Sequence, residues 1–479
     1  MTNTSLPAYE RPVTPVERLF TRSPFSLVAM VARIRGAVTE SMLRTALEEV
    51  RRRHVNLCVR VTDDENGAPY FTTDGAGEIA VQVVPWESED QWIGLLNETS
   101  ENPFAFDERP PIRFFLLRAP THSDLLIVSH HIICDGLSLA YLARDLVAHL
   151  GDSNLEAEVP PNPVLVGLDT IPEDARLNPI ARAILRRMNR KWQSERVVFG
   201  QQDYLDLTAA YWDNFCHVTL PIEFSEEQTD ALVARCRAES VTVNTALTAA
   251  FVSAQIERNG GKLPHPRTGI ATSLRDRLRA PVGEAMGFYA SSVTLKAKWR
   301  RGSSFSANAR RLQRRIQPLV RGRGSFKDPV SWCHLDPTIL EAQNFKKLGG
   351  LVPPDAPSHE KLSSFARRDD VVKRILKLGG MESLDKTFMG TFVTNLTRLE
   401  FPRRYGSLEL DRLILQPGAA YPLSQAELVV GAVTCSGKLS LVMEFADDGK
   451  RIAAMKGVRD KAIELLLGSP CDTGSDTAG

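Results

Sequence analysis

Two adjacent histidines are the residues of this chain whose type and spacing best support chemistry. His130 and His131 are followed, after three more residues, by Asp135 and Gly136, which gives the pattern HHxxxDG. An imidazole with an ordinary pKa near ~6.5 is mostly neutral at pH 7 and can take a proton from a reacting group. The natural reaction is removal of a proton from a hydroxyl or amine as it attacks an acyl carbonyl.

The segments on either side of the pattern are expected to position it. Upstream, the apolar run 125–128 predicts a buried strand that ends at Ser129. Downstream, leucines three and four residues apart between 139 and 150 predict a helix, and Gly151 stands where that helix would end. The histidines therefore lie at the end of a strand, from which a basic side chain can extend into a cleft.

Each residue of the pattern also has a structural interpretation. Asp135 can be an N-cap that accepts backbone N–H groups of the following helix. His130 is expected to be a core histidine with a satisfied hydrogen bond, and Gly136 can serve a tight turn. Cys134 is expected to be a small buried residue rather than a reactive thiol.

The pattern and its surroundings resemble the acyltransferase superfamily that includes chloramphenicol acetyltransferase, nonribosomal peptide condensation domains and mycobacterial polyketide-associated acyltransferases. Residues 109–118 are similar to the strand that precedes the motif strand in that superfamily, and residues 240–247 to the start of a helix in its C-terminal half. There the second histidine is the catalytic base and the aspartate is chiefly structural. The resemblance implies that His131 is the base and Asp135 the orienting acid.

The resemblance also implies an α/β fold of two chloramphenicol acetyltransferase-like subdomains, each a mixed β-sheet packed with helices, with the active site at their interface. A chain of 479 residues is too long for one ordinary core. We expect an N-terminal subdomain at 1–155, a connecting segment with a basic helix at 156–215, a C-terminal subdomain at 216–468 and a disordered tail at 469–479. Both halves open with a strand and a capped helix, which is a weak internal repeat.

The basic helix of the connecting segment is predicted from residues 182–196, where apolar residues such as Leu185 and Trp192 recur at helical spacing. It is either an amphipathic surface helix or a docking face for an acidic carrier protein or for the phosphates of coenzyme A.

The acyl group is expected to arrive already activated. The sequence has no GxSxG nucleophile elbow for a covalent acyl-enzyme and no Walker loop for ATP activation. A thioester donor and direct transfer to the acceptor follow as the working mechanism. The expected donor is acyl-coenzyme A or an acyl carrier protein, and no bound cofactor or metal is expected.

The tetrahedral intermediate of such a transfer needs hydrogen-bond donors for its oxyanion. The backbone N–H of Gly136 is one candidate, and Ser291, Ser292 and Asn395 of the second half are others. Arg275 is a candidate partner for the Asp135 carboxylate. Residues 394–396 are the nearest match to a DFGWG-like motif of plant relatives that the chain lacks, so the C-terminal contribution to the site stays open.

The bulk properties exclude several other classes of protein. Hydrophobic residues make up 43% of the chain, charged residues 24%, and the net charge is +1, which argues against extensive nucleic-acid binding. The seven cysteines are scattered without a CxxC pair, which favours a reducing compartment and no zinc site. No signal peptide or transmembrane segment is visible, so a cytoplasmic monomer is expected.

Three hypotheses remain. The chain can be an enzyme that transfers an acyl group from a thioester to an alcohol, a condensation enzyme that forms an amide on an amine, or a non-catalytic protein that binds carrier proteins. Because no carrier domain is visible, the sequence favours a free-standing O-acyltransferase similar to the mycobacterial phthiocerol dimycocerosyl transferases, in lipid or polyketide biosynthesis.

Overall fold

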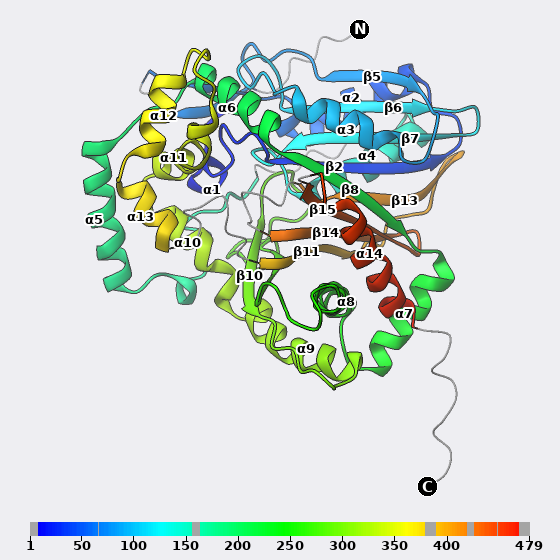
Figure 1. Cartoon of the computed structure of the whole chain (residues 1–479). Coiled ribbons are helices and arrows are strands. Elements are labelled where there is room, and N and C mark those ends of the chain that lie inside the picture. Colours follow the sequence, from blue (N-terminus) through cyan, green and yellow to red (C-terminus); the bar gives the residue numbers. More distant parts are fainter. Residues whose placement is uncertain are drawn as a thin grey trace.

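Two six-stranded sheets, each packed with helices, form the body of the molecule (Figure 1). The computed structural model describes residues 8–65, 67–155, 163–378, 389–418, 426–447 and 449–468. The predicted α/β fold with two sheet-containing subdomains is therefore confirmed. The predicted tail at 469–479 lies outside the described residues.

The first sheet has the strand order β12-β13-β2-β7-β6-β5. Four of its strands come from the first half of the chain: β2 (Leu27–Arg35), β5 (Ala80–Pro85), β6 (Ile112–Arg118) and β7 (His122–His130). The helices packed on it are α2 (Glu40–Arg53), α3 (Gln91–Glu101) and α4 (Gly136–Gly151). Strand β7 is buried almost throughout because α2 and α4 cover one face of the sheet and α3 the other. This explains the unbroken apolar run at 125–128.

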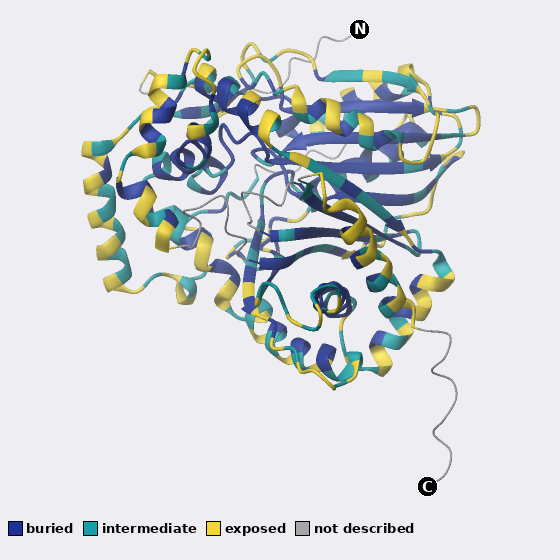
Figure 2. Ribbon diagram, in the orientation of Figure 1, coloured by how far each residue is buried: buried dark blue, intermediate teal, exposed yellow. Residues whose placement is uncertain are grey.

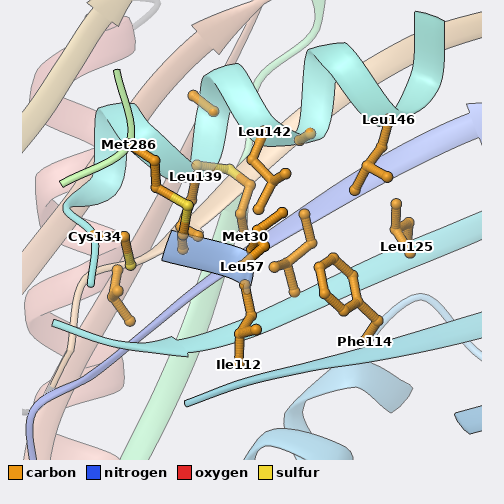
Figure 3. Packing of buried hydrophobic residues seen from close by; sticks show 14 of the residues in the cluster. Met30, Leu57, Ile112, Phe114, Leu125, Cys134, Leu139, Leu142, Leu146 and Met286 are labelled. Carbon is orange, nitrogen blue, oxygen red and sulfur yellow. The ribbon is translucent and has the colours of Figure 1, made fainter. Parts of the chain in front are cut away.

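The helix that follows the histidines is fixed to the sheet by its leucines. Figure 3 shows Leu139, Leu142 and Leu146 pointing from α4 toward the strands that carry Ile112 and Leu125. All of these side chains are buried. Burying one such side chain contributes about 1.5–3 kcal/mol, so α4 is held firmly on the strand that ends at the histidines.

A small sheet lies beside the first one, with the order β1-β4-β3. Its elements and their neighbours are β1 (Glu10–Pro12), α1 (Pro15–Arg18), the short helix η1 (Val55–Leu57), β3 (Arg60–Asp63) and β4 (Pro69–Thr72).

The second sheet has the order β10-β9-β11-β14-β15-β8. Its strands are β8 (Cys216–Glu223), β9 (Arg267–Ser273), β10 (Ala290–Lys296), β11 (Met389–Arg398), β14 (Ala426–Cys435) and β15 (Lys438–Asp447). The helices beside it are α7 (Glu226–Ala238), α8 (Val243–Arg258), α9 (Phe305–Arg321) and α14 (Ile452–Leu467), with α8 in the middle of this layer (Figure 1). Ser436 and Gly437 form the turn that joins β14 to β15, and both residues have positive φ, as a two-residue hairpin of this type requires.

Two strands cross from the second half of the chain into the first sheet. They are β12 (Arg404–Tyr405) and β13 (Leu408–Gln416), and β13 pairs antiparallel with β2. The expected assignment of the whole of 216–468 to the second subdomain is wrong for β12 and β13. Their hydrogen bonds and buried leucines belong to the first sheet and its core.

A third group of helices packs around its own apolar cluster at one side of the two sheets. It contains α5 (Pro179–Glu195), α6 (Gln201–Asn214), α10 (Lys327–His334), α11 (Pro337–Leu348), α12 (His359–Arg367) and α13 (Val371–Leu378), with short helices η2 (Glu173–Ala175), η3 (Arg323–Phe326) and η4 (Gly349–Leu351) between elements of this region. The predicted basic helix is α5. Trp192 anchors it, since the ring is fully buried and Nε1 donates to Thr338 Oγ1 at 2.7 Å. The outward face of α5 is exposed (Figure 2).

Candidate active site

His131 lies directly after the last residue of β7, and its backbone N–H donates to the Ser26 carbonyl at 2.8 Å. The side chain is half-buried. Its Nδ1 lies 3.1 Å from the Cys134 carbonyl oxygen. Because a carbonyl oxygen only accepts, Nδ1 carries the hydrogen in the neutral ring, and the lone pair is on Nε2. The backbone thus selects the tautomer that a general base needs.

Two phenylalanines from different parts of the chain pack on this ring. The centroid of Phe20 lies 5.3 Å from that of His131, and the centroid of Phe288 lies 5.5 Å from it with the planes at 82°. Phe20 and Phe288 also contact each other, with centroids 4.4 Å apart. Burial lowers the pKa of His131, and the Cys134 carbonyl and the Asp135 carboxylate offset only part of this effect. The imidazole is therefore neutral at pH 7.

Asp135 caps α4 and at the same time joins the two halves of the molecule. Its Oδ1 accepts hydrogen bonds from the N–H of Ser138 at 2.8 Å and from the Arg275 guanidinium at 3.0 Å. Its Oδ2 accepts from the backbone N–H of Tyr289 at 3.0 Å. The partnership between Arg275 and Asp135 that the sequence suggested is thus present, and Arg275 follows β9 by two residues.

Burial works to raise the pKa of Asp135, but Arg275 and the hydrogen bonds from Ser138 and Tyr289 outweigh it and lower the pKa below its ordinary value. Arg275 also donates to the Ser138 hydroxyl at 2.8 Å and to the carbonyls of Gly283 and Ala285. Asp135 is therefore an ionised carboxylate, and both of its oxygens accept hydrogen bonds that hold the loop after His131.

His130 and Cys134 have structural roles. The Nε2 of His130 lies 3.1 Å from the Ser23 carbonyl, its Nδ1 accepts from the Ile132 N–H, and the ring is fully buried. Burial lowers the pKa of His130 to about 3. The Cys134 thiol donates to Ser129 Oγ, and burial raises its pKa. Both fit the structural interpretations given above.

Gly136 is the first residue of α4, and its missing side chain leaves room for two leucines. A Cβ atom at this position would lie 3.2 Å from Leu396 Cδ2 and 3.3 Å from Leu415 Cδ1. These leucines belong to β11 and β13, so the glycine allows elements of both sheets to approach the helix start. Its N–H is in the first turn, where backbone donors lack helical partners.

The other predicted residues of the second half have partners away from the histidine. The Ser291 hydroxyl donates to the Ser325 carbonyl at 2.5 Å, and Asn395 Oδ1 accepts from the Thr397 N–H at 2.7 Å. Ser292 is half-buried on β10 and lies opposite Ala271 of β9. None of these contacts, within the described part of the chain, involves His131.

Sequence reasoning missed Gly418, which lies beside Nε2 of His131. A Cβ atom on Gly418 would lie 3.6 Å from His131 Nε2 and 2.5 Å from the Leu27 carbonyl oxygen, and φ is +89°. The dipeptide Pro417-Gly418 is a turn signal, but nothing local shows that the turn is near residue 131.

A cavity of about 160 Å³ is lined in part by Ile132 of the motif. Thr21, Arg22 and Gln201 are among its lining residues. Among the residues that the structure describes, no group of three or more histidine, cysteine or acidic side chains is arranged to hold a metal ion. No helix in that part of the chain is long and apolar enough to cross a membrane.

Comparisons with known proteins agree with this geometry. Residues 10–164 match the model of the condensation domain, and residues 217–322 match that of the phthiocerol/phthiodiolone dimycocerosyl transferase C-terminus. Nonribosomal peptide synthetase agiA of Aspergillus flavus is 32% identical over 158 residues, which is 31% of this chain and 2% of that protein. The chain thus spans only a small part of the length of such relatives.

Two solved structures have the same fold. Polyketide synthase associated protein 5 from Mycobacterium tuberculosis aligns over 96% of this chain and 99% of its own, with a TM-score of 0.57 and 14% identity. The trichothecene 15-O-acetyltransferase TRI3 from Fusarium sporotrichioides aligns over 96% of this chain and 95% of its own, with a TM-score of 0.62 and 12% identity. With the HHxxxDG residues in place where the two sheets meet, the chain is similar in its first half to condensation domains and in its second half to the dimycocerosyl transferase C-terminus, and it shares the fold of both kinds of acyltransferase structure.

Proposed function

We propose that this chain is an acyltransferase that moves an acyl group from a thioester to an alcohol and forms an ester. The observation that carries the proposal is the hydrogen bond between His131 Nδ1 and the Cys134 carbonyl, which keeps the lone pair on Nε2. The two family matches support acyl transfer in natural-product biosynthesis as the general class of reaction.

In the proposed reaction, His131 Nε2 removes the proton from the acceptor hydroxyl while its oxygen attacks the thioester carbonyl. A tetrahedral intermediate forms, and we assign the Gly136 N–H as a donor to its oxyanion, with Ser292 as a weaker candidate. The intermediate collapses as the carbon–sulfur bond breaks, and the proton on Nε2 passes to the departing thiolate. Asp135 and Arg275 hold the loop and do not take part in proton transfer.

Amide formation on an amine is the second candidate. The match of residues 10–164 to the condensation domain favours it, whereas the match of residues 217–322 to a dimycocerosyl transferase favours the ester. An amine acceptor would use the same base and the same intermediate. The acceptor pocket decides between an alcohol and an amine, since His131 would serve as the base for either acceptor.

The donor is proposed to be coenzyme A or a carrier protein. The exposed face of α5 carries Arg186, Arg187 and Arg190, and such a basic face attracts phosphate or an acidic carrier. The monomeric state and the cytoplasmic location stay predictions.

A thiol-release assay tests the proposal, using purified protein, acyl thioesters and panels of alcohols and amines, with mass spectrometry of the product. We expect thiol release that depends on an alcohol and is abolished by His131→Ala. His359→Ala is the matched control, because that ring is also half-buried and also has Nδ1 on a backbone carbonyl, Val352 at 2.7 Å. Full activity in His131→Ala would disprove the general base, product from amines alone would establish the second candidate, and no transfer to either acceptor would favour a non-catalytic protein.

A further inference from the structure

A buried chain of polar side chains leads from the interior of the second sheet to the backbone beside His131. The N–H of Gly418 donates to Gln416 Oε1 at 3.2 Å. The other end of that amide, Nε2, donates to the carboxylate of Glu444. Gln416 and Glu444 are both buried, on β13 of the first sheet and β15 of the second. This contact therefore joins the two sheets next to Gly418.

The series of polar side chains continues on the other side of the Glu444 carboxylate. His217 Nδ1 lies 3.3 Å from Glu444 Oε1, and His217 Nε2 lies 2.7 Å from the hydroxyl of Tyr211. Tyr211 is fully buried on α6, and His217 is on the edge strand β8. A buried carboxylate is costly unless it is paired or hydrogen-bonded, and here an amide and an imidazole face its two oxygens.

The carboxylate fixes the orientation of the amide. An ionised carboxylate only accepts hydrogen bonds, so the amide must turn its NH₂ group toward Glu444. The carbonyl oxygen of Gln416 then points the opposite way, toward the Gly418 N–H. The orientation of one buried side chain thus determines where the backbone of residue 418 is held.

The position of Gly418 matters because it borders the reactive nitrogen. A Cβ atom at this position would lie 3.6 Å from Nε2 of His131, in van der Waals contact with that nitrogen. A second glycine lets the chain reach this place: a Cβ atom on Gly431 would lie 2.6 Å from the Leu415 carbonyl and 3.0 Å from Pro417 Cδ. The approach of β13 to β14 is therefore close, and the Gly418 backbone just after β13 is held by Gln416.

We propose that Gln416 and Glu444 are positioning residues that hold the Gly418 backbone as one wall of the space in which the acceptor meets His131. The proposal rests on the proposed function, because it concerns the same base. Neither residue touches the reacting atoms. Their effect is to fix a backbone wall, and a displacement of about 1 Å near a reacting group costs on the order of 100-fold in rate.

Three variants separate positioning from simple stability. Gln416→Met removes both hydrogen bonds and keeps the volume similar. Gln416→Glu sets two buried carboxylates against each other. The double variant Gln416→Glu with Glu444→Gln restores a complementary pair, because the new glutamate accepts from both the Gly418 N–H and the new glutamine. Gln313→Met is the matched control, since Gln313 is another buried amide that accepts hydrogen bonds from Thr242, far from His131 in the helix layer of the second sheet.

The first readout is the steady-state rate with donor and acceptor. We expect kcat of Gln416→Met to fall by about 10- to 100-fold with little change in the KM of the thioester, and the double variant to return within about threefold of wild type. Gln416→Glu should lose at least as much activity as Gln416→Met, because its new carboxylate faces that of Glu444 and cannot donate to it. Gln313→Met should lower the melting temperature and leave kcat unchanged.

The second readout does not depend on the reaction. Hydrogen exchange at the Gly418 amide, measured by mass spectrometry of fragments, should be at least about tenfold faster in Gln416→Met and return toward the wild-type rate in the double variant. Normal kcat and normal exchange in folded Gln416→Met, or a folded double variant with no recovery of either, would overturn the proposal. If wild type showed no acyl transfer, the proposed function would fail, and the exchange result would still decide whether this chain of side chains holds Gly418.

Discussion

Arg275 and Asp135 are 140 residues apart in the sequence and are joined by a buried hydrogen bond of 3.0 Å. Both side chains are almost completely buried, 3% and 5% exposed. The pair connects the loop after β9 in the second sheet to the start of α4 on the first. It therefore fixes the two halves to each other at the residue that orients the loop of His131.

Removal of Arg275 should destabilise the protein strongly. Arg275→Ala leaves Asp135 buried without its counter-ion, and breaking a buried pair in this way costs about 3–5 kcal/mol. Urea unfolding measures the loss. Arg310→Ala is the control, because its ion pair with Glu239 is exposed, and such pairs contribute about 0–1 kcal/mol. An equal loss in the free energy of unfolding for both substitutions would show that the buried pair stabilises the protein no more than an exposed one.

The pH dependence of the reaction should follow His131. Burial places its pKa below the ordinary 6.5. The base is active only when neutral, so kcat/KM should rise with pH as the ring loses its proton, with the midpoint of the rise below pH 6.5. Initial rates between pH 4 and pH 8, measured on protein that is still folded at each pH, test this. An ascending limb centred above pH 6.5 would mean that another group is the base or that the ring is more exposed.

His130 should make the folded state sensitive to acid. Its pKa is about 3 in the folded protein and ordinarily 6.5. Between these values the unfolded chain binds a proton that the folded chain does not, so the free energy of unfolding falls as the pH decreases from 6.5 toward 3. His130→Asn, which does not titrate, should reduce the slope of stability against pH in this window. An unchanged slope would assign the acid sensitivity to other groups.

Gly136 should not tolerate a methyl group. Gly136→Ala places Cβ 3.2 Å and 3.3 Å from two buried leucines on different sheets, and such overpacking costs about 1–3 kcal/mol. Gly457→Ala is the opposite case. Gly457 is in the exposed interior of α14 with open space around it, so alanine should stabilise the helix by about 0.5–1 kcal/mol. Melting temperatures of the two variants should therefore shift in opposite directions.

Local sequence was enough to predict the strand and the helix on either side of His131. The run 125–128, the cap at Asp135 and the leucines from 139 to 150 all act through neighbours in the chain, and β7 and α4 form where those patterns place them. The paired strands β6 and β7 and the hairpin at Ser436 and Gly437 were also predictable, because turn residues mark them.

The placement of the second-half residues was not predictable in the same way. Asn395 is on the strand expected to contribute to the site, yet it closes a local turn with Thr397, where the pairing of β11 with β14 shifts register. One shift of register moves side chains to the other face of a sheet. No sequence pattern other than the turn dipeptide Pro417-Gly418 points to Gly418, although this residue lies beside Nε2 of His131.

The sequence by itself determined the HHxxxDG unit with the strand before it and the capped helix after it, because these depend on residues within a few positions of one another. Only the tertiary structure decided that Phe288 and Gly418 lie beside His131. Their contacts form across more than 100 residues, and they arise from the way β13 leaves the second half to pair with β2 and from the packing of the two sheets. No local periodicity encodes such an approach, since it is set by the fit of whole layers.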